Sequence, residues 1–98
     1  MYVEAMTTVQ PTVEEYTTRL ERTLPAVRDR IERAASAAGR SASSVRLVAV
    51  TKSHPLEAVD AALLTGLVDL GENRVQELAE KVMARGQGVA TWHMIGHI

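Results

Sequence analysis

Apolar side chains recur every three or four residues between positions 13 and 38, which is the period of one face of a helix. Thr12 and Glu15 have the spacing of a capping box, in which each side chain bonds the other residue's amide, so the helix is expected to begin directly after Thr12. Pro25 lacks an amide hydrogen and predicts a kink or a break within this helix. Gly39 predicts its end in the left-handed conformation.

Further along the chain, short apolar runs alternate with segments of helical period. The runs at 45–51, 68–71 and 91–95 are too short for buried helices and predict strands. The segments 56–65 and 74–85 between them predict helices. The second of these helices is expected to bury four apolar side chains: Val75, Leu78, Ala79 and Val82. Strand, helix, strand, helix, strand is typical of parallel βαβ units.

These elements predict an α/β fold of about three parallel strands with intervening helices, preceded by one long helix. The even spacing of the strands suits a (β/α)8 barrel or a doubly wound sheet equally well. A barrel usually takes about 250 residues, and three parallel strands alone leave an unpaired edge. The 98-residue chain is therefore expected to be a fragment or a truncated product, whose exposed sheet edge could support an oligomer.

The composition narrows the class of protein. Apolar residues make up 46% and charged residues 23% of the chain, which is typical of a globular domain. The net charge of −1 argues against a nucleic-acid partner, and the lack of cysteine excludes disulfides and thiolate metal sites. Neither a secretory signal nor an apolar run of about 18 residues is present, so a cytoplasmic protein without a membrane partner is expected.

Lys52 is the first candidate for chemistry, because it follows an apolar run at the carboxyl end of the first predicted strand. Ligands gather at such ends in barrels and open sheets alike. Apolar neighbours would disfavour the charged amine, and a neutral amine forms a Schiff base with an aldehyde or ketone. Pro55, at the expected first helical position, and Glu57 predict a short, stiff turn after it. From spacing alone, the position also fits a lysine that extends into solvent.

Asn73 follows the second predicted strand and is expected on the same rim as Lys52. Its side chain could bond a ligand, or it could cap the next helix together with Gln76. Arg74 and Glu77 are expected to face solvent.

The third predicted strand carries Trp92, expected in the core, and His93. His93 and His97 are four residues apart, which spans about 13 Å along a strand and is too far for one metal ion. No metal site is therefore predicted. Gly96 would let the backbone turn or a ligand approach closely. His54 is expected to be a capping or surface residue.

Three stretches, VAVTKSHP at 48–55, GENRVQE at 71–77 and WHMIGH at 92–97, together resemble the motifs of the pyridoxal phosphate homeostasis proteins. The resemblance runs from about Val27 to Ile98. That family is similar in fold to the N-terminal barrel of alanine racemase. The resemblance implies that 12–98 form the N-terminal, truncated part of a (β/α)8 TIM-type barrel, after a flexible tail at 1–11.

The resemblance also implies a function. Lys52 would hold the cofactor pyridoxal 5′-phosphate as a Schiff base, with Asn73, Gly96 and His97 nearby, and the protein would bind and buffer this small molecule without turning over a substrate. Two alternatives stay open. One is a fragment of a pyridoxal phosphate enzyme of the same barrel type, an amino-acid racemase or a Schiff-base lyase. The other is a degenerate truncated product without cofactor function.

Overall fold

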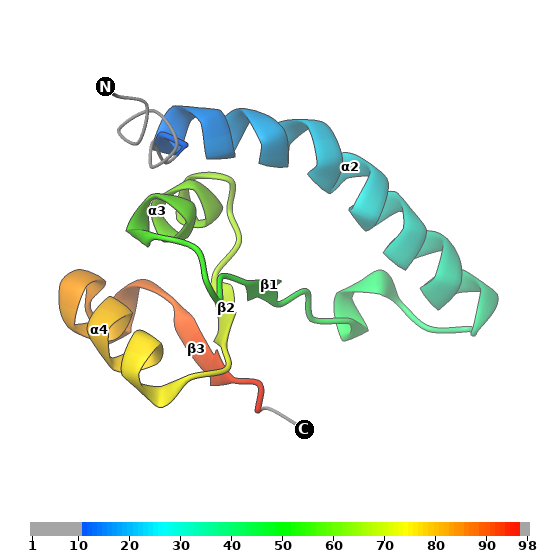
Figure 1. Cartoon of the computed structure of the whole chain (residues 1–98). Helices are drawn as coiled ribbons and strands as arrows, with labels where there is room; N and C mark the ends of the chain where they lie inside the picture. The colour runs from blue at the N-terminus through cyan, green and yellow to red at the C-terminus, as the bar shows by residue number, and fades with distance from the viewer. Residues whose placement is uncertain (1–10, 97–98) are drawn as a thin grey trace.

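Three parallel strands and the helices that connect them form the centre of the computed structural model, which describes residues 11–96 (Figure 1). The strands pair in the order β1–β2–β3. Their bounds are β1 Ala49–Val50, β2 Asp69–Glu72 and β3 Thr91–Met94. The helices are α2 Val13–Ala37, α3 Leu56–Leu64 and α4 Val75–Arg85, with single 3₁₀ turns η1 Ala42–Ser44 and η2 Gln87–Val89. The predicted α/β order of elements is confirmed.

The core lies between one face of the sheet and the helices. Leu70 of β2 is fully buried against Val59 and Ala62 of α3, and Leu67 completes this cluster. Leu20 and Leu24 bring α2 onto it, so that α2 lies across α3 (Figure 1). Both α2 and α3 thus contribute side chains to the core on the sheet face that carries Leu70. Trp92, partly buried against the same cluster, packs in the core as predicted.

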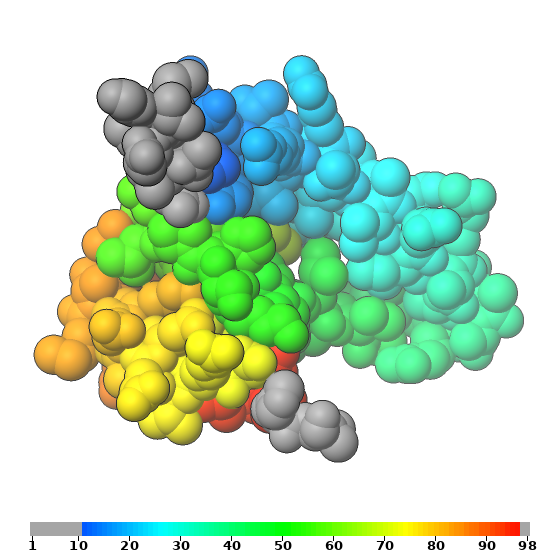
Figure 2. Space-filling view, in the orientation of Figure 1, coloured from blue at the N-terminus to red at the C-terminus, as the bar shows by residue number. Residues whose placement is uncertain are grey.

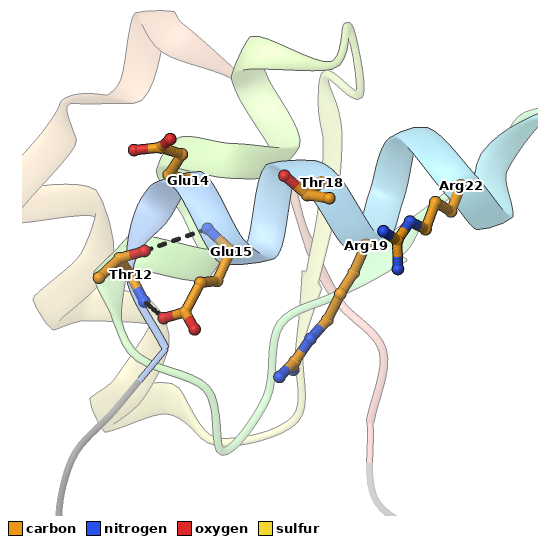
Figure 3. A pocket seen from close by; sticks show the side chains of 6 residues that line it. All are labelled: Thr12, Glu14, Glu15, Thr18, Arg19 and Arg22. Atoms are coloured by element: carbon orange, nitrogen blue, oxygen red, sulfur yellow. Dashed lines mark hydrogen bonds between the residues drawn. The ribbon is translucent and has the colours of Figure 1, made fainter.

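The capping box at the start of α2 is confirmed (Figure 3). The Thr12 amide donates to Oε1 of Glu15 at 2.8 Å, and the Glu15 amide donates to Oγ1 of Thr12 at 3.1 Å. The bond from the Thr12 amide to the carboxylate lowers the pKa of Glu15, and the Thr12 hydroxyl acts on the carboxyl in the same direction. Arg19 and Arg22 line a surface hollow beside the pair (Figure 3). The helix therefore begins where local sequence alone places its start.

The middle and the end of α2 give opposite results for the sequence predictions. The helix runs from Val13 to Ala37 without a break at Pro25, so a break there is wrong. Pro25 is exposed, and the carbonyl that loses its amide partner can be hydrated, which reduces the cost of the missing bond. Gly39, with φ 71°, ends the helix as predicted, and the following amide of Arg40 donates to the Ala35 carbonyl at 2.8 Å.

The first strand is much shorter than predicted, β2 is shifted by one residue at both ends, and β3 ends one residue earlier than predicted. Only Ala49 and Val50 pair with β2, opposite Leu70 and Gly71. The segment 45–48 precedes the paired part of β1 and lies outside the described sheet ladder. Its apolar composition therefore predicts a paired strand correctly only at Ala49 and Val50. Within residues 11–96, no helix is long and apolar enough to cross a membrane.

Replacing the capping hydroxyl in Thr12→Ala is expected to lower the free energy of unfolding by about 1 kcal/mol, since the Glu15 amide loses its acceptor. Urea-induced unfolding followed by circular dichroism measures this change. Thr18→Ala, at an exposed position on the same helix, is the control. Equal effects of the two substitutions would contradict a capping role for Thr12.

Candidate functional site

The carboxyl ends of the three strands form one rim of the sheet. The Thr51 amide donates to the Gly71 carbonyl at 3.0 Å, and the Ile95 amide donates to the Glu72 carbonyl at 2.9 Å, so pairing continues just past the strands. Lys52, Asn73 and Gly96 follow at these neighbouring ends, as the sequence predicts for parallel strands. Gly96 has φ 79°, a conformation that favours glycine. The fourth candidate, His97, lies outside the described residues.

Lys52 itself occupies the turn between β1 and α3, and its side chain is exposed. The apolar surroundings expected to strip water from its amine are therefore absent from the described part of the chain. The reason is the place of β1 at an edge of the sheet, with only β2 beside it. In Figure 2 the green surface that includes this turn lies open between α2, in blue, and α4, in yellow. An aldehyde in solution can reach the Lys52 amine directly.

The residue before Lys52 is held by buried side chains of β2 and α4. Thr51 is buried, and its hydroxyl donates to Oε2 of Glu72 at the end of β2. The Thr51 carbonyl accepts bonds from Nζ of Lys81, on α4, at 2.8 Å and from the His54 amide at 3.0 Å. The end of β1 is thus fixed to both β2 and α4.

The residue after Lys52 is anchored separately. Ser53 has φ 63°, in the left-handed region, and its amide donates to Oε2 of Glu77 at 3.0 Å. This bond lowers the pKa of the Glu77 carboxyl, and the nearby charge of Lys81 acts in the same direction. The turn therefore presents one free amine between two held residues.

Glu72 and Lys81 form a buried ion pair beneath this turn. Glu72 is fully buried and Lys81 is 6% exposed, and Nζ of Lys81 lies 2.7 Å from Oε2 of Glu72. The same Nζ lies 3.9 Å from Oε2 of Glu77, one helical turn earlier on α4. Because a buried charge is costly without a partner, the pair forces β2 and α4 into this arrangement.

The other face of the sheet carries a second set of side chains. Asp69 pairs with His93 at 2.9 Å and lies 3.7 Å from Arg46. A β-carbon on Gly71 would lie 3.0 Å from Cγ2 of Ile95, so a larger residue there would displace its neighbours. Within residues 11–96, no three metal-ligating side chains lie together. This face is therefore apolar near the rim and polar at the start of the strands.

Comparison with known proteins identifies relatives of the chain. A protein of Deinococcus radiodurans is 49% identical over 74 residues, which make up 74% of this chain and 34% of that protein. A protein of Pseudomonas aeruginosa is 45% identical over 69 residues, 70% of this chain and 30% of its own. One of Escherichia coli K12 is 40% identical over 76 residues, 74% of this chain and 32% of its own. No protein-family profile matches the chain.

All three relatives carry the name pyridoxal phosphate homeostasis protein. The matched part of this chain is homologous to the pyridoxal phosphate homeostasis proteins. The resemblance predicted from the three motifs is thereby confirmed. The chain spans about a third of the length of the relatives it matches.

The sequence does not predict the residues that hold the turn around Lys52 in this homologue of the pyridoxal phosphate homeostasis proteins. Glu77 is not simply exposed to solvent as predicted, because it accepts the Ser53 amide. Val75 is 71% exposed and Ala79 is exposed, although both were predicted to be buried, whereas Lys81 is buried. The charge of Glu72 decides which face of α4 turns inward. The four-residue spacing of Glu77 and Lys81 was the available signal, since it predicts a pair on one helix face.

The two predicted helix caps near the rim are also wrong. The N-cap of α4 is Arg74, with no side-chain cap bond, so Asn73 and Gln76 do not cap this helix. Pro55 is itself the N-cap of α3 rather than its first helical residue, and Glu57 closes no cap. Each helix begins one residue later than the capping pattern predicts. Asn73 is thus half-buried at the rim without a capping role.

His54 is exposed, as predicted, and also links the turn to α2. Its Nδ1 lies 3.3 Å from the Tyr16 hydroxyl, and the two rings meet edge to face with centroids 5.9 Å apart. The long helix therefore contacts the segment that carries Lys52.

Removing one partner of the buried pair, in Glu72→Leu, is expected to lower the free energy of unfolding by about 3 kcal/mol or more, because Lys81 keeps a buried charge. Replacing both, in Glu72→Leu with Lys81→Met, is expected to cost less than Glu72→Leu alone, since no charge then stays buried. Denaturant unfolding at neutral pH measures both variants. A double variant that is less stable than the single one would contradict the ion-pair account.

The bond from Ser53 to Glu77 predicts a pH-dependent contribution to stability. The folded-state pKa of Glu77 lies below its ordinary value of 4.5, so the carboxylate stabilises the fold fully well above pH 4.5. That contribution is lost as the pH falls through the folded-state pKa. The difference in unfolding free energy between wild type and Glu77→Gln is therefore expected to shrink on acidification. A difference that is constant with pH would contradict this.

Proposed function

We propose that this chain binds pyridoxal 5′-phosphate through a Schiff base on Lys52, acts in pyridoxal phosphate homeostasis, and turns over no substrate. The names of the homologues support the link to the cofactor. The observation that carries the proposal is the turn at the end of β1, where an exposed amine lies between two anchored residues.

The lysines of the chain fit a single attachment point. The sequence contains two lysines, Lys52 and Lys81. Lys81 is buried, and its amine donates to Glu72 and to the Thr51 carbonyl, so it is neither accessible nor free to react. Lys52 is exposed. An aldehyde therefore meets one lysine of the fold, at the rim where parallel sheets bind ligands.

The cofactor supplies an aldehyde that condenses reversibly with a primary amine. Lys52 supplies that amine, and the anchored turn holds it at a defined place on the rim. Asn73, half-buried at the next strand end, offers an amide for the ring substituents or an oxygen of the cofactor. Gly96, at the end of β3, has no side chain to block a close approach.

We further propose that the sheet is part of a (β/α)8 barrel like the N-terminal barrel of alanine racemase. Consecutive strands are neighbours and parallel, and α3 packs on one face of the sheet. The opposite face carries Val48, Val50 and Ile95 around Gly71. Val50 is 46% and Ile95 is 43% exposed. Branched aliphatic side chains of this kind fill the interior of such barrels, which supports the assignment.

Borohydride reduction of the chain with pyridoxal phosphate, followed by intact mass and peptide mapping, tests the attachment. One adduct on Lys52 is expected, lost in Lys52→Ala, while Lys81 stays unmodified because it is buried. Circular dichroism is the check that each variant is folded.

A control separates a site from a merely exposed amine. Lys52→Ala combined with Arg28→Lys moves the exposed lysine to an exposed position on α2. Labelling at position 28 is expected to require a higher cofactor concentration than labelling at Lys52 in the wild type. If labelling at the two positions depends equally on the cofactor concentration, the proposal of a cofactor site is contradicted.

A further inference from the structure

We propose that Glu77 is a positioning residue for Lys52: its carboxylate holds the Ser53 amide and so fixes the turn that presents the lysine to the cofactor. This inference rests on the proposed function, because it concerns the same amine. It assigns a role to a residue of α4 that lies outside the rim itself.

The conformation of Ser53 is the first observation behind it. Among residues 11–96, Ser53 is the one non-glycine residue with a positive φ, at 63°. An L-residue is disfavoured there because its β-carbon crowds the backbone. Such a conformation persists when surrounding bonds hold it, and strained positions of this kind cluster at functional sites. Two bonds hold it: the Ser53 amide donates to Glu77, and the His54 amide donates to the Thr51 carbonyl across the turn at 3.0 Å.

The separation of the two anchors is the second observation. The Thr51 anchor is built from the buried Glu72 and Lys81, on which the packing of β2 and α4 also depends. The Ser53 anchor is a single carboxylate whose side chain is 25% exposed. Losing Glu77 therefore frees one side of the Lys52 turn while leaving the buried pair in place.

A neighbouring positive charge favours the ionised form of Glu77, which accepts the bond from the Ser53 amide. Nζ of Lys81 lies 3.9 Å from its Oε2, and the two residues are one helical turn apart. This neighbour favours the ionised carboxylate, which accepts a backbone amide more strongly than a neutral group does. Lys81 thus serves both anchors, through the Thr51 carbonyl and through Glu77.

Without Glu77, the bond from the His54 amide to the Thr51 carbonyl remains of the two, so Ser53 samples a right-handed conformation more often, which moves the backbone next to Lys52. The amine then samples many positions, and ordering it on binding reduces the binding free energy of the cofactor. In Glu77→Ala, the pyridoxal phosphate concentration that gives half-maximal trapping at Lys52 is expected to rise about tenfold or more. Thermal unfolding is expected to change little by comparison.

Two further variants make the measurement specific. Glu80→Ala removes an exposed acidic residue from the same helix but no bond to Ser53, so it controls for the change of charge near the turn. Ser53→Gly in the Glu77→Ala background makes the left-handed conformation accessible again, because glycine adopts positive φ readily. This double variant is expected to recover part of the lost affinity.

A second readout does not depend on the cofactor. In amide-resolved NMR of the unliganded chain, the Ser53 amide proton is expected to shift as Glu77 titrates, since a carboxylate acceptor is replaced by a neutral one. The shift is expected to be absent in Glu77→Ala and retained in Glu80→Ala.

The outcomes separate this inference from the proposed function. Selective trapping in the wild type, with loss in Glu77→Ala, no loss in Glu80→Ala and partial recovery with Ser53→Gly, supports positioning. If trapping in the wild type is selective but Glu77→Ala weakens it no more than Glu80→Ala does, the positioning role of Glu77 is overturned. The proposed function then stands. If trapping in the wild type is not selective, the proposed function and the positioning role are both overturned. A Ser53 amide proton that still shifts as Glu77 titrates would then show that the bond from Ser53 to Glu77 exists and that only the cofactor role is wrong.

Discussion

The ion pair between Glu72 and Lys81 is the contact on which the arrangement of the described sheet and its last helix depends. A fully buried carboxylate needs a cation, and Lys81 supplies it from α4 at 2.7 Å. The same ammonium bonds the Thr51 carbonyl, and the Thr51 hydroxyl bonds Glu72. Three segments distant in sequence thus meet at one charge pair. A shift of any one segment would leave a buried charge or hydroxyl without its partner.

This pair also explains how the interior changes character along β2. Leu70 and Glu72 lie two residues apart and on the same side of the strand, since side chains alternate between faces. Leu70 packs in an apolar cluster with α3, whereas Glu72 meets Lys81 and Thr51. The apolar contacts of Leu70 stabilise the fold but are non-directional. The ion pair and hydrogen bonds of Glu72 require defined positions of their partners near the rim. The buried polar contacts of Glu72 therefore lie next to the strand ends that carry Lys52 and Asn73.

Homology and geometry bear on different questions about this chain. The relatives are named pyridoxal phosphate homeostasis proteins, and the match covers about three quarters of this chain and a third of theirs. The structure adds that the two lysines have opposite surroundings, one exposed at the rim and one buried below it. It also shows that the residues flanking Lys52 are held by polar side chains of β2 and α4. An exposed reactive group on a rigid support is a common arrangement for a binding site.

The sequence by itself determined the order of the elements, the start and end of α2, and the rim that carries Lys52 and Asn73. These features depend on local periodicity, on caps and glycines, and on the rule that parallel strands end together. The tertiary structure decided the length of β1, which needs a partner strand, and the inward face of α4, which turns Lys81 toward a buried carboxylate rather than burying Val75. It also decided the role of Glu77, because a bond between residues 24 positions apart has no local signature. Such choices depend on which distant groups must be paired once water is excluded.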